Sequence, residues 1–312
     1  MSEIRGNTES GPKAPITFQV SEKESIFAQI TGLWRYREMI WNLVVRDLKV
    51  KYKGSALGFL WSFLNPLILM TLYWIIFTKL APDMKRDIPT ISGNEVNYGI
   101  FLISSMWPWM AFQGAVAKSA PIFILNDSLI KKVYFPREVL PVATVMSEFV
   151  NFLFGIGIFL VILIFTGYQP TISFLLFPVM LYVLVAFTLG CSLLVSVMDV
   201  FYRDTEQILN SFLTILFFAT PIIYSVTLVR EKLLGTYAEL SEFLIWRNQV
   251  LSHVYFANPL AWIIPYTRYT LLGGLQLIKA HVIIIMVVAS TLFLLFAYWR
   301  FKAIEHRIVE EV

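Results

Sequence analysis

The chain has 312 residues, of which 57% are hydrophobic and only 15% are charged. Soluble globular proteins carry about 25% charged residues, so a soluble fold of this length would have too few charges to cover its surface. The composition predicts an all-α polytopic membrane protein. The single cysteine, Cys191, excludes an intrachain disulfide and cysteine-rich metal sites. We attribute the net charge of +4 to basic residues at the inner ends of membrane helices rather than to nucleic-acid binding.

The N-terminal region is predicted to have two parts. Residues 1–32 are polar and contain no apolar segment after a basic start, so we expect a flexible cytoplasmic tail and no cleaved targeting sequence. Residues 33–53 have the pattern of an amphipathic helix that lies in the plane of the membrane interface. Arg46 and Lys49 fall on its narrow polar arc, whereas Arg37 and Asp47 fall within the apolar arc and are expected to have partners. The pattern fits a plain membrane anchor, and it also fits a lever that joins the membrane domain to a cytoplasmic partner.

Six membrane spans are predicted within a single transmembrane domain, 54–312. Each span needs about 20 apolar residues to cross a hydrocarbon core about 30 Å thick. Runs with few or no charges place the spans near 55–79, 96–118, 139–166, 172–197, 207–229 and 279–299, of which the third includes Glu148.

The segment Asn248–Thr267 is also uncharged, but it contains Pro and Asn residues that interrupt a helix. We therefore expect short re-entrant or interfacial helices on the outer side there, rather than a seventh span. With six spans, 17 of the 25 Lys and Arg residues lie on the side that holds both termini. This bias predicts cytoplasmic N- and C-termini.

A basic loop, 126–138, follows the second predicted span. Asn126, Asp127 and Ser128 favour the start of a helix, which Phe135-Pro136 would end after one or two turns. We expect this loop to expose apolar side chains, as a docking element for another protein does. The alternative is a loop packed on its own helix ends. The candidate docking residues are Leu129, Ile130, Lys131, Lys132, Val133, Tyr134, Phe135, Pro136 and Arg137.

Glu148 is the only acidic residue well inside a predicted span. A charge in the bilayer is costly and usually faces the protein interior. Pairing with a nearby Lys or Arg and a role in transport are both compatible with its position. The sequence contains no G-x-x-x-x-G-K-[ST] phosphate loop and no convincing acid/base pair, so no catalytic, cofactor or metal site is predicted. Any active work would take its energy from another chain.

Several motifs, taken in their order along the chain, resemble the membrane permease subunit of ABC exporters of polysaccharides, such as O-antigen, capsule or teichoic-acid-type polymers. The resemblance runs from about residue 34 to the C-terminus. The motifs are Arg46-Asp47-Leu48-Lys49-Val50-Lys51-Tyr52-Lys53, Leu57-Gly58-Phe59-Leu60-Trp61, Leu64-Asn65-Pro66-Leu67, residues 129–138, Phe201-Tyr202-Arg203-Asp204, Thr220-Pro221-Ile222-Ile223-Tyr224 and Asn258-Pro259-Leu260.

The resemblance implies a homodimer of this chain in the bacterial cytoplasmic membrane, together with two copies of a separate subunit that binds ATP and Mg²⁺. It implies that residues 127–136 form a coupling helix seated in that subunit, and that short gate helices lie within 227–270. It also implies that a lipid-linked polysaccharide passes through a channel at the dimer interface, lined partly by spans one and five. The candidate channel residues are Trp61, Asn65, Tyr73, Phe217, Phe218 and Tyr224.

Other functions remain open on the sequence alone. One is an ABC exporter of another lipid or amphipathic substrate. A membrane-embedded lipid or sugar enzyme would need clustered acids, for which Asp199, Asp204 and Glu206 are the best candidates. A scaffold or receptor subunit is a third possibility.

Overall fold

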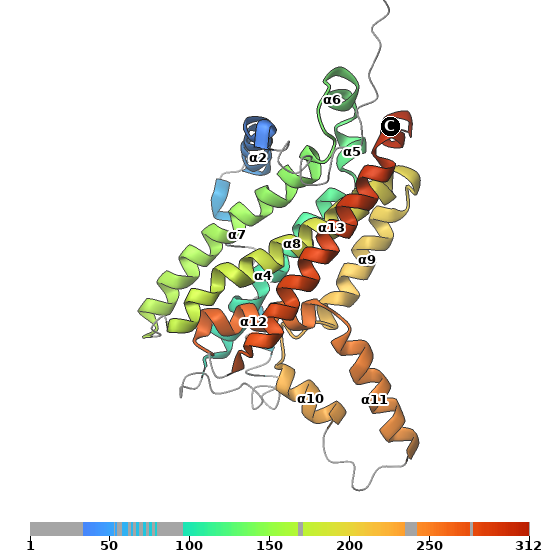
Figure 1. Ribbon diagram of the computed structural model, residues 1–312. Coiled ribbons are helices and arrows are strands. Elements are labelled where there is room, and N and C mark those ends of the chain that lie inside the picture. Colours follow the sequence, from blue (N-terminus) through green and yellow to red (C-terminus); the bar gives the residue numbers. More distant parts are fainter. Residues whose placement is uncertain are drawn as a thin grey trace, which may run out of the picture.

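The computed structural model describes residues 34–52, 54, part of the stretch 58–79, and then 96–167, 171–234, 242–274 and 277–311. All regular structure within these residues is helical, which confirms the all-α class. Most of the first predicted span and the N-terminal tail lie outside the described residues. Figure 1 shows a bundle of long helices that run in alternating directions, with short helices at both ends.

Four described helices are long and apolar enough to cross a membrane, which agrees with a polytopic membrane protein. They overlap the second, third, fourth and sixth predicted spans. They are α4 (Tyr98–Ser119), α7 (Val139–Phe165), α8 (Phe177–Phe201, preceded by the short helix η5, Ile172–Leu176) and α13 (Ala280–Glu311).

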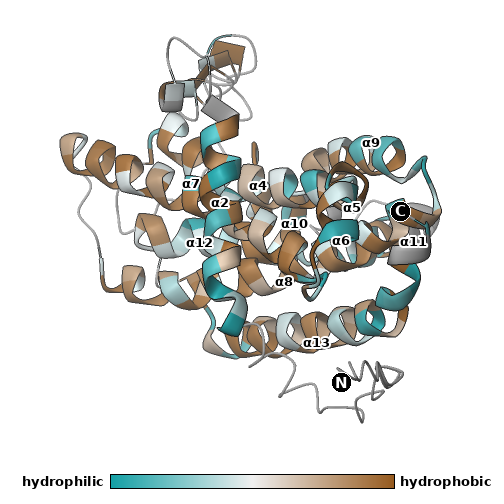
Figure 2. Ribbon diagram, turned by 90° about the horizontal axis from the view of Figure 1, so that it is seen from above, coloured by the Kyte–Doolittle hydropathy of each residue, from teal (hydrophilic) through white to brown (hydrophobic). Residues whose placement is uncertain are grey.

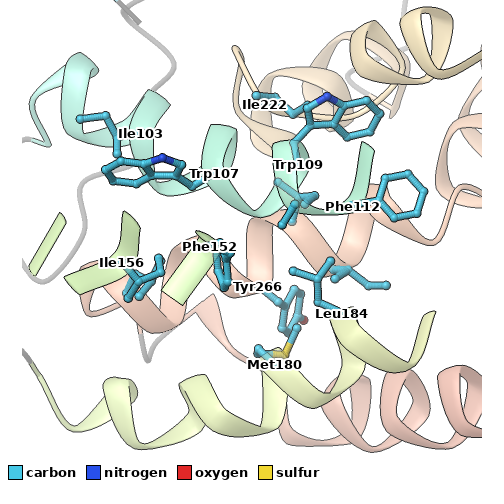
Figure 3. Packing of buried hydrophobic residues seen from close by; sticks show 14 of the residues in the cluster. Ile103, Trp107, Trp109, Phe112, Phe152, Ile156, Met180, Leu184, Ile222 and Tyr266 are labelled. Atoms are coloured by element: carbon cyan, nitrogen blue, oxygen red, sulfur yellow. The ribbon is translucent and has the colours of Figure 1, made fainter. Parts of the chain in front are cut away.

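Helix α4 is the centre of the bundle, because 78% of its apolar window is buried, compared with 22% for α13. Its aromatic side chains fill the core: Trp109 is 1% exposed, and its ring packs 5.6 Å from that of Phe217. Figure 3 shows Trp107, Trp109 and Phe112 of α4 facing the apolar residues of the neighbouring helices. The outer faces of α7 and α13 are instead apolar and exposed, as a lipid-facing surface requires (Figure 2).

Helices α8 and α13 pack closely because α8 has a glycine at the contact. A Cβ atom added to Gly190 would lie only 2.7 Å from the ring of Phe293. This close approach joins the C-terminal helix firmly to the middle of the bundle.

The shorter helices gather at the two ends of the bundle (Figure 1). One end, here called the α6 end, holds the amphipathic helix α2 (Arg37–Tyr52, after the turn η1, Trp34–Tyr36), α5 (Ile122–Leu125), α6 (Asp127–Lys132) and the C-terminus of α13. The opposite end holds α10 (Val226–Leu234), α11 (Glu242–Phe256) and α12 (Leu260–Leu272).

The helix expected over 207–229 is interrupted in the structure. Helix α9 spans Thr205–Phe218, and the chain then follows an irregular path before α10 begins at Val226. Pro221 accounts for the break, because proline has no N–H to donate and disfavours a helical conformation at the residue before it. The uncharged segment 248–267 forms the end of α11 and the start of α12, which are separate helices as its Pro and Asn residues indicated.

Candidate functional site

The loop 126–138 at the α6 end exposes only some of the apolar side chains expected on its surface. Tyr134 is 90% exposed and Val133 is 45% exposed, whereas Ile130 and Phe135 are 3% and 1% exposed. The expectation that Ile130 and Phe135 are exposed was therefore wrong. Both side chains belong to a core cluster with residues of α2, α7 and α13. They attach the loop to the bundle, and the exposed residues of the loop are Ser128, Lys131, Lys132, Val133 and Tyr134.

Arg137 fixes the conformation of this loop. Its guanidinium donates a hydrogen bond to the carbonyl of Phe135 and lies 5.6 Å from the ring of Tyr134. Its backbone N–H donates to Glu305 Oε1 of α13, at 3.0 Å. The exposed tyrosine is thus held beside the C-terminal part of α13.

A buried ionic network joins the same loop to α13. Lys302 Nζ lies 2.7 Å from Glu138 Oε1 and 2.8 Å from Glu305 Oε2. The hydroxyl of Tyr298 donates to Glu138 Oε1 at 3.1 Å. Burial and the nearby charge of Glu305 raise the pKa of Glu138, and Lys302 opposes this shift. The members of this network are far apart along the chain, so the sequence pattern does not predict it.

Helix α2 lies against the bundle through Ile40, Leu43 and Val44, which are all buried. The partners expected for its two unusual charges are present: Asp47 pairs with Arg46 at 2.9 Å, and Arg37 lies 5.6 Å from the ring of Trp34. Lys49 is exposed.

One polar contact joins α2 to the loop 126–138, here called the docking loop after the role expected of it. Arg46 donates to Asn126 Oδ1 at 3.2 Å, and Asn126 is buried at the start of that loop. The amphipathic helix and the docking loop are therefore in direct contact.

Glu148 pairs with a lysine, as one of the two interpretations of its position required. Lys118, at the end of α4, donates to Glu148 Oε1. The lysine side chain is 50% exposed and that of Glu148 only 8% exposed. Gly114 leaves room for the carboxylate, since an added Cβ atom there would lie 3.1 Å from Glu148 Oε2. The hydrophobic pattern does not indicate which cation is the partner of Glu148.

A polar cavity of about 780 Å³ opens beside this pair at the α6 end. It lies between α2, α4, α5, α7 and α9. Its polar lining residues are Arg46, Asp47, Lys118, Asn126, Thr144, Ser147, Glu148, Glu206 and Asn210.

Helix α9 continues the polar lining away from this cavity. Five polar residues, all exposed, share one side of the helix: Glu206, Gln207, Asn210, Ser211 and Thr214. We call this the α9 polar stripe. The opposite side exposes Ile208, Phe212 and Ile215. A helix with both a polar and an apolar exposed side suits the boundary between a water-filled space and lipid. The helical spacing of these polar residues is visible in the sequence, although they were not among the predicted site residues.

The candidate channel residues divide into three groups. Asn65 and Tyr73 lie outside the described residues, and Trp61 is 41% exposed. Phe217 and Phe218 fall on the side of α9 that carries the polar stripe, and Phe218 is 57% exposed. Tyr224 lies after the break, and its hydroxyl donates to the carbonyl of Phe218 at 2.8 Å. Phe217, Phe218 and Tyr224 therefore lie together at the end of α9.

Comparison with known proteins shows which family the chain belongs to. Residues 38–255 match the family described as ABC-2 type transporter. An O-antigen export system permease protein RfbA of Myxococcus xanthus is 34% identical over 203 residues, which cover 65% of this chain and 74% of the relative. Two RfbA permeases of Klebsiella pneumoniae are 36% identical over 220 residues and 37% identical over 207 residues, covering 68% and 65% of this chain and 81% and 76% of the relatives.

The chain therefore belongs to the ABC-2 type transporter family. It is the membrane subunit of a transporter rather than an enzyme, and its family and apolar helices place it in the bacterial inner membrane. Membership in this family implies, in general, an ABC subunit that binds ATP. The alternative of a membrane-embedded lipid or sugar enzyme is set aside by this result.

Proposed function

We propose that this chain is the permease of an ATP-driven exporter that moves a polysaccharide, in lipid-linked form, across the inner membrane. The observation that supports this most directly is the 34–37% identity to three O-antigen export permeases over about two thirds of the chain. Two copies of the chain would enclose the conduit, and two copies of an ATP-binding subunit would attach to the α6 end, with both termini in the cytoplasm. ATP and Mg²⁺ would bind to that partner.

In this proposal the polymer passes along the α9 polar stripe. The stripe begins at the polar cavity, which Glu206 and Asn210 help to line, and ends at Phe217 and Phe218. Hydroxyl and amide groups exchange hydrogen bonds with sugar hydroxyls, and aromatic faces stack on sugar rings. A second copy of the chain would close the conduit opposite the stripe.

Force from the ATP-binding partner would enter through Val133 and Tyr134. Because Arg137 and Glu138 are each bonded to the C-terminal part of α13, a displacement of the loop is passed to α13. Helix α13 packs on α8 at Gly190, so the displacement reaches the middle of the bundle. A change of conformation requires contacts that differ between two states, and the ATP-bound and ATP-free partner would provide them.

The test compares the two sides of α9 in cells that depend on this chain for polymer export. Asn210→Leu and Thr214→Leu should lower export and leave polymer inside the cell, because they remove polar side chains from the α9 polar stripe. Ile208→Leu and Ile215→Leu, on the opposite side of the same helix, should leave export unchanged. Normal surface polysaccharide in cells that lack the chain entirely would refute the proposed function.

A second substrate class is favoured by one observation. An apolar cavity of about 760 Å³ lies between α4, α8, α9, α11 and the start of α12, with Phe212, Leu216 and Val254 among its lining residues. A cavity of this kind would suit the hydrocarbon chain of a lipid that carries no polymer. In that case a lipid, and no glycan, would accumulate in the inner membrane of cells without the chain.

A further inference from the structure

The break between α9 and α10 lies deep in the bundle. Arg268, which donates to the carbonyls of Pro221 and Ile222 in the middle of the break, also donates to Ser105, seven residues inside α4 and therefore about 10 Å from the start of that helix. Thr220 and Ile222 within the break are fully buried. Irregular backbone at membrane depth is tolerated only where its polar groups find partners in the protein or in trapped water.

Every carbonyl from residue 218 to residue 223 accepts a hydrogen bond, and almost all the donors are side chains. Only the carbonyl of Thr220 is satisfied by backbone, from the N–H of Ile222 at 2.8 Å. The remaining bonds are Tyr224 Oη to Phe218 at 2.8 Å, Asn258 Nδ2 to Ala219 at 3.3 Å, Arg268 Nη2 to Pro221 at 2.9 Å and to Ile222 at 2.8 Å, and Tyr98 Oη to Ile223 at 2.8 Å.

Arg268 of α12 makes the central two of these bonds. Its side chain is 1% exposed, its Nε donates to Ser105 Oγ at 2.5 Å, and its guanidinium lies 3.6 Å from the centre of the Phe101 ring. Its contacts within the described part of the chain are carbonyl oxygens, a hydroxyl and an aromatic ring, with no carboxylate among them. Burying a charge without an ion partner is costly, so this arginine is not explained by salt-bridge formation.

The geometry points instead to a positioning role: we propose that Arg268 holds the α9–α10 break in its observed path, and so holds Phe218 and Tyr224 in place. One nitrogen reaches two successive carbonyls while another reaches α4, which requires the planar, branched group of arginine. A lysine has a single nitrogen and cannot span the same acceptors. The role of Arg268 in holding the break does not depend on the proposed function. The further statement that the break shapes the outer mouth of a polysaccharide conduit rests on that function.

A thiol accessibility experiment tests this role in the full-length chain in lipid nanodiscs. The reporter is Ser225→Cys, an isosteric change at a buried position (3% exposed) at the end of the break, in a Cys191→Ser background. Arg268→Lys should raise the rate at which a small polar thiol reagent modifies residue 225 by about tenfold, the factor that corresponds to losing one charge-assisted hydrogen bond. Arg230→Lys, an exposed arginine of α10, is the matched control and should leave the rate unchanged.

The natural thiol of Cys191, in the middle of α8, separates a local effect from general loosening. Its modification rate should not change in Arg268→Lys when Ser225 is left in place. Equal rates for Arg268→Lys and Arg230→Lys at residue 225 would overturn the proposal, and so would a parallel rise at Cys191. If the Arg268→Lys protein does not accumulate, Ser105→Ala is used in its place. A smaller rise in the modification rate of residue 225 is expected, and the same two outcomes would overturn the proposal.

Export measured on the same variants keeps the two proposals apart. A wild-type chain that exports no polysaccharide refutes the proposed function and leaves the accessibility result intact. An unchanged accessibility at residue 225 refutes the role of Arg268 even if export is normal.

Discussion

Glu138 and Lys302 form an ion pair of 2.7 Å between the start of α7 and the C-terminal part of α13. The carboxylate is 2% exposed and is also bonded to Tyr298. Because Glu138 is the last residue of the docking loop, this contact is where that loop joins the C-terminal helix.

Removing the charge of Lys302 should show how much the stability of the protein depends on this ion pair. Lys302→Met leaves Glu138 buried without its ion partner, and breaking a buried pair in this way costs about 3 kcal/mol. We expect a lower thermal unfolding temperature in detergent and a weaker dependence of partner ATP hydrolysis on this chain. The double variant Glu138→Gln/Lys302→Met, which leaves no charge behind, should recover much of the stability. A double variant as unstable as Lys302→Met would contradict the conclusion that the unpaired charge of Glu138 causes the loss of stability.

The same carboxyl should make stability depend on pH. Burial and Glu305 raise the pKa of Glu138 above the ordinary value of 4.5, so the folded protein holds this proton more strongly than the unfolded chain does. Stability is therefore lost as the pH rises from 4.5 through the raised pKa. The variant Glu138→Gln cannot titrate, so its unfolding temperature should lack this decline. The measurement is thermal unfolding from pH 4.5 upward, and identical pH profiles for the two proteins would exclude this effect.

Tyr134 should matter for partner binding and not for folding. Its ring is 90% exposed and adds nothing to the core, so Tyr134→Asp is expected to insert and melt like the wild type while losing the ATP-binding partner in co-purification. Tyr134→Phe keeps the ring and should retain the partner. By contrast, Phe135→Ala removes a buried ring and should destabilise the fold by about 3–5 kcal/mol. Co-purification of Tyr134→Asp with the partner at wild-type yield would remove the docking role.

Two glycines of neighbouring helices give a matched test of the α8–α13 contact. Gly190→Ala places a methyl group 2.7 Å from the ring of Phe293 and should cost about 1–3 kcal/mol, because that ring must move within a packed contact. An alanine at Gly157, on the exposed side of α7, meets no atom within 4 Å and should be neutral or slightly stabilising. Unfolding temperatures of the two variants provide the comparison, and equal values would mean that α8 and α13 are not closely packed.

The sequence predicted the long elements well and the contacts between them poorly. Charge-free runs located α4, α7, α8 and α13, because a bilayer imposes a length and a composition on every span. The prediction from hydrophobicity alone treated α9 and α10 as one span. Thr220-Pro221 within that run was a local signal for a break. The exposed surface of the docking loop was overestimated, since the burial of Ile130 and Phe135 depends on α13, about 170 residues further along the chain.

The polar contacts could not have been assigned from one sequence. A buried acid was identified at Glu148, but its partner Lys118 belongs to another helix, and Arg268 was counted only as one more basic residue on the outer side. Such pairs depend on which helices become neighbours, and the hydrophobic pattern does not specify that. The α9 polar stripe is different, because all its residues belong to one helix. Their spacing along the sequence is therefore enough to predict that they share one side.

The length of α13 has a mechanical consequence. A helix of 32 residues is about 48 Å long, which exceeds a hydrocarbon core of about 30 Å. If such a rod pivots near one end, a rotation of only about 5° moves its far end by roughly 4 Å. A small adjustment where Lys302 meets Glu138 is thereby enlarged across the thickness of the bilayer, with no change in the internal structure of the helix.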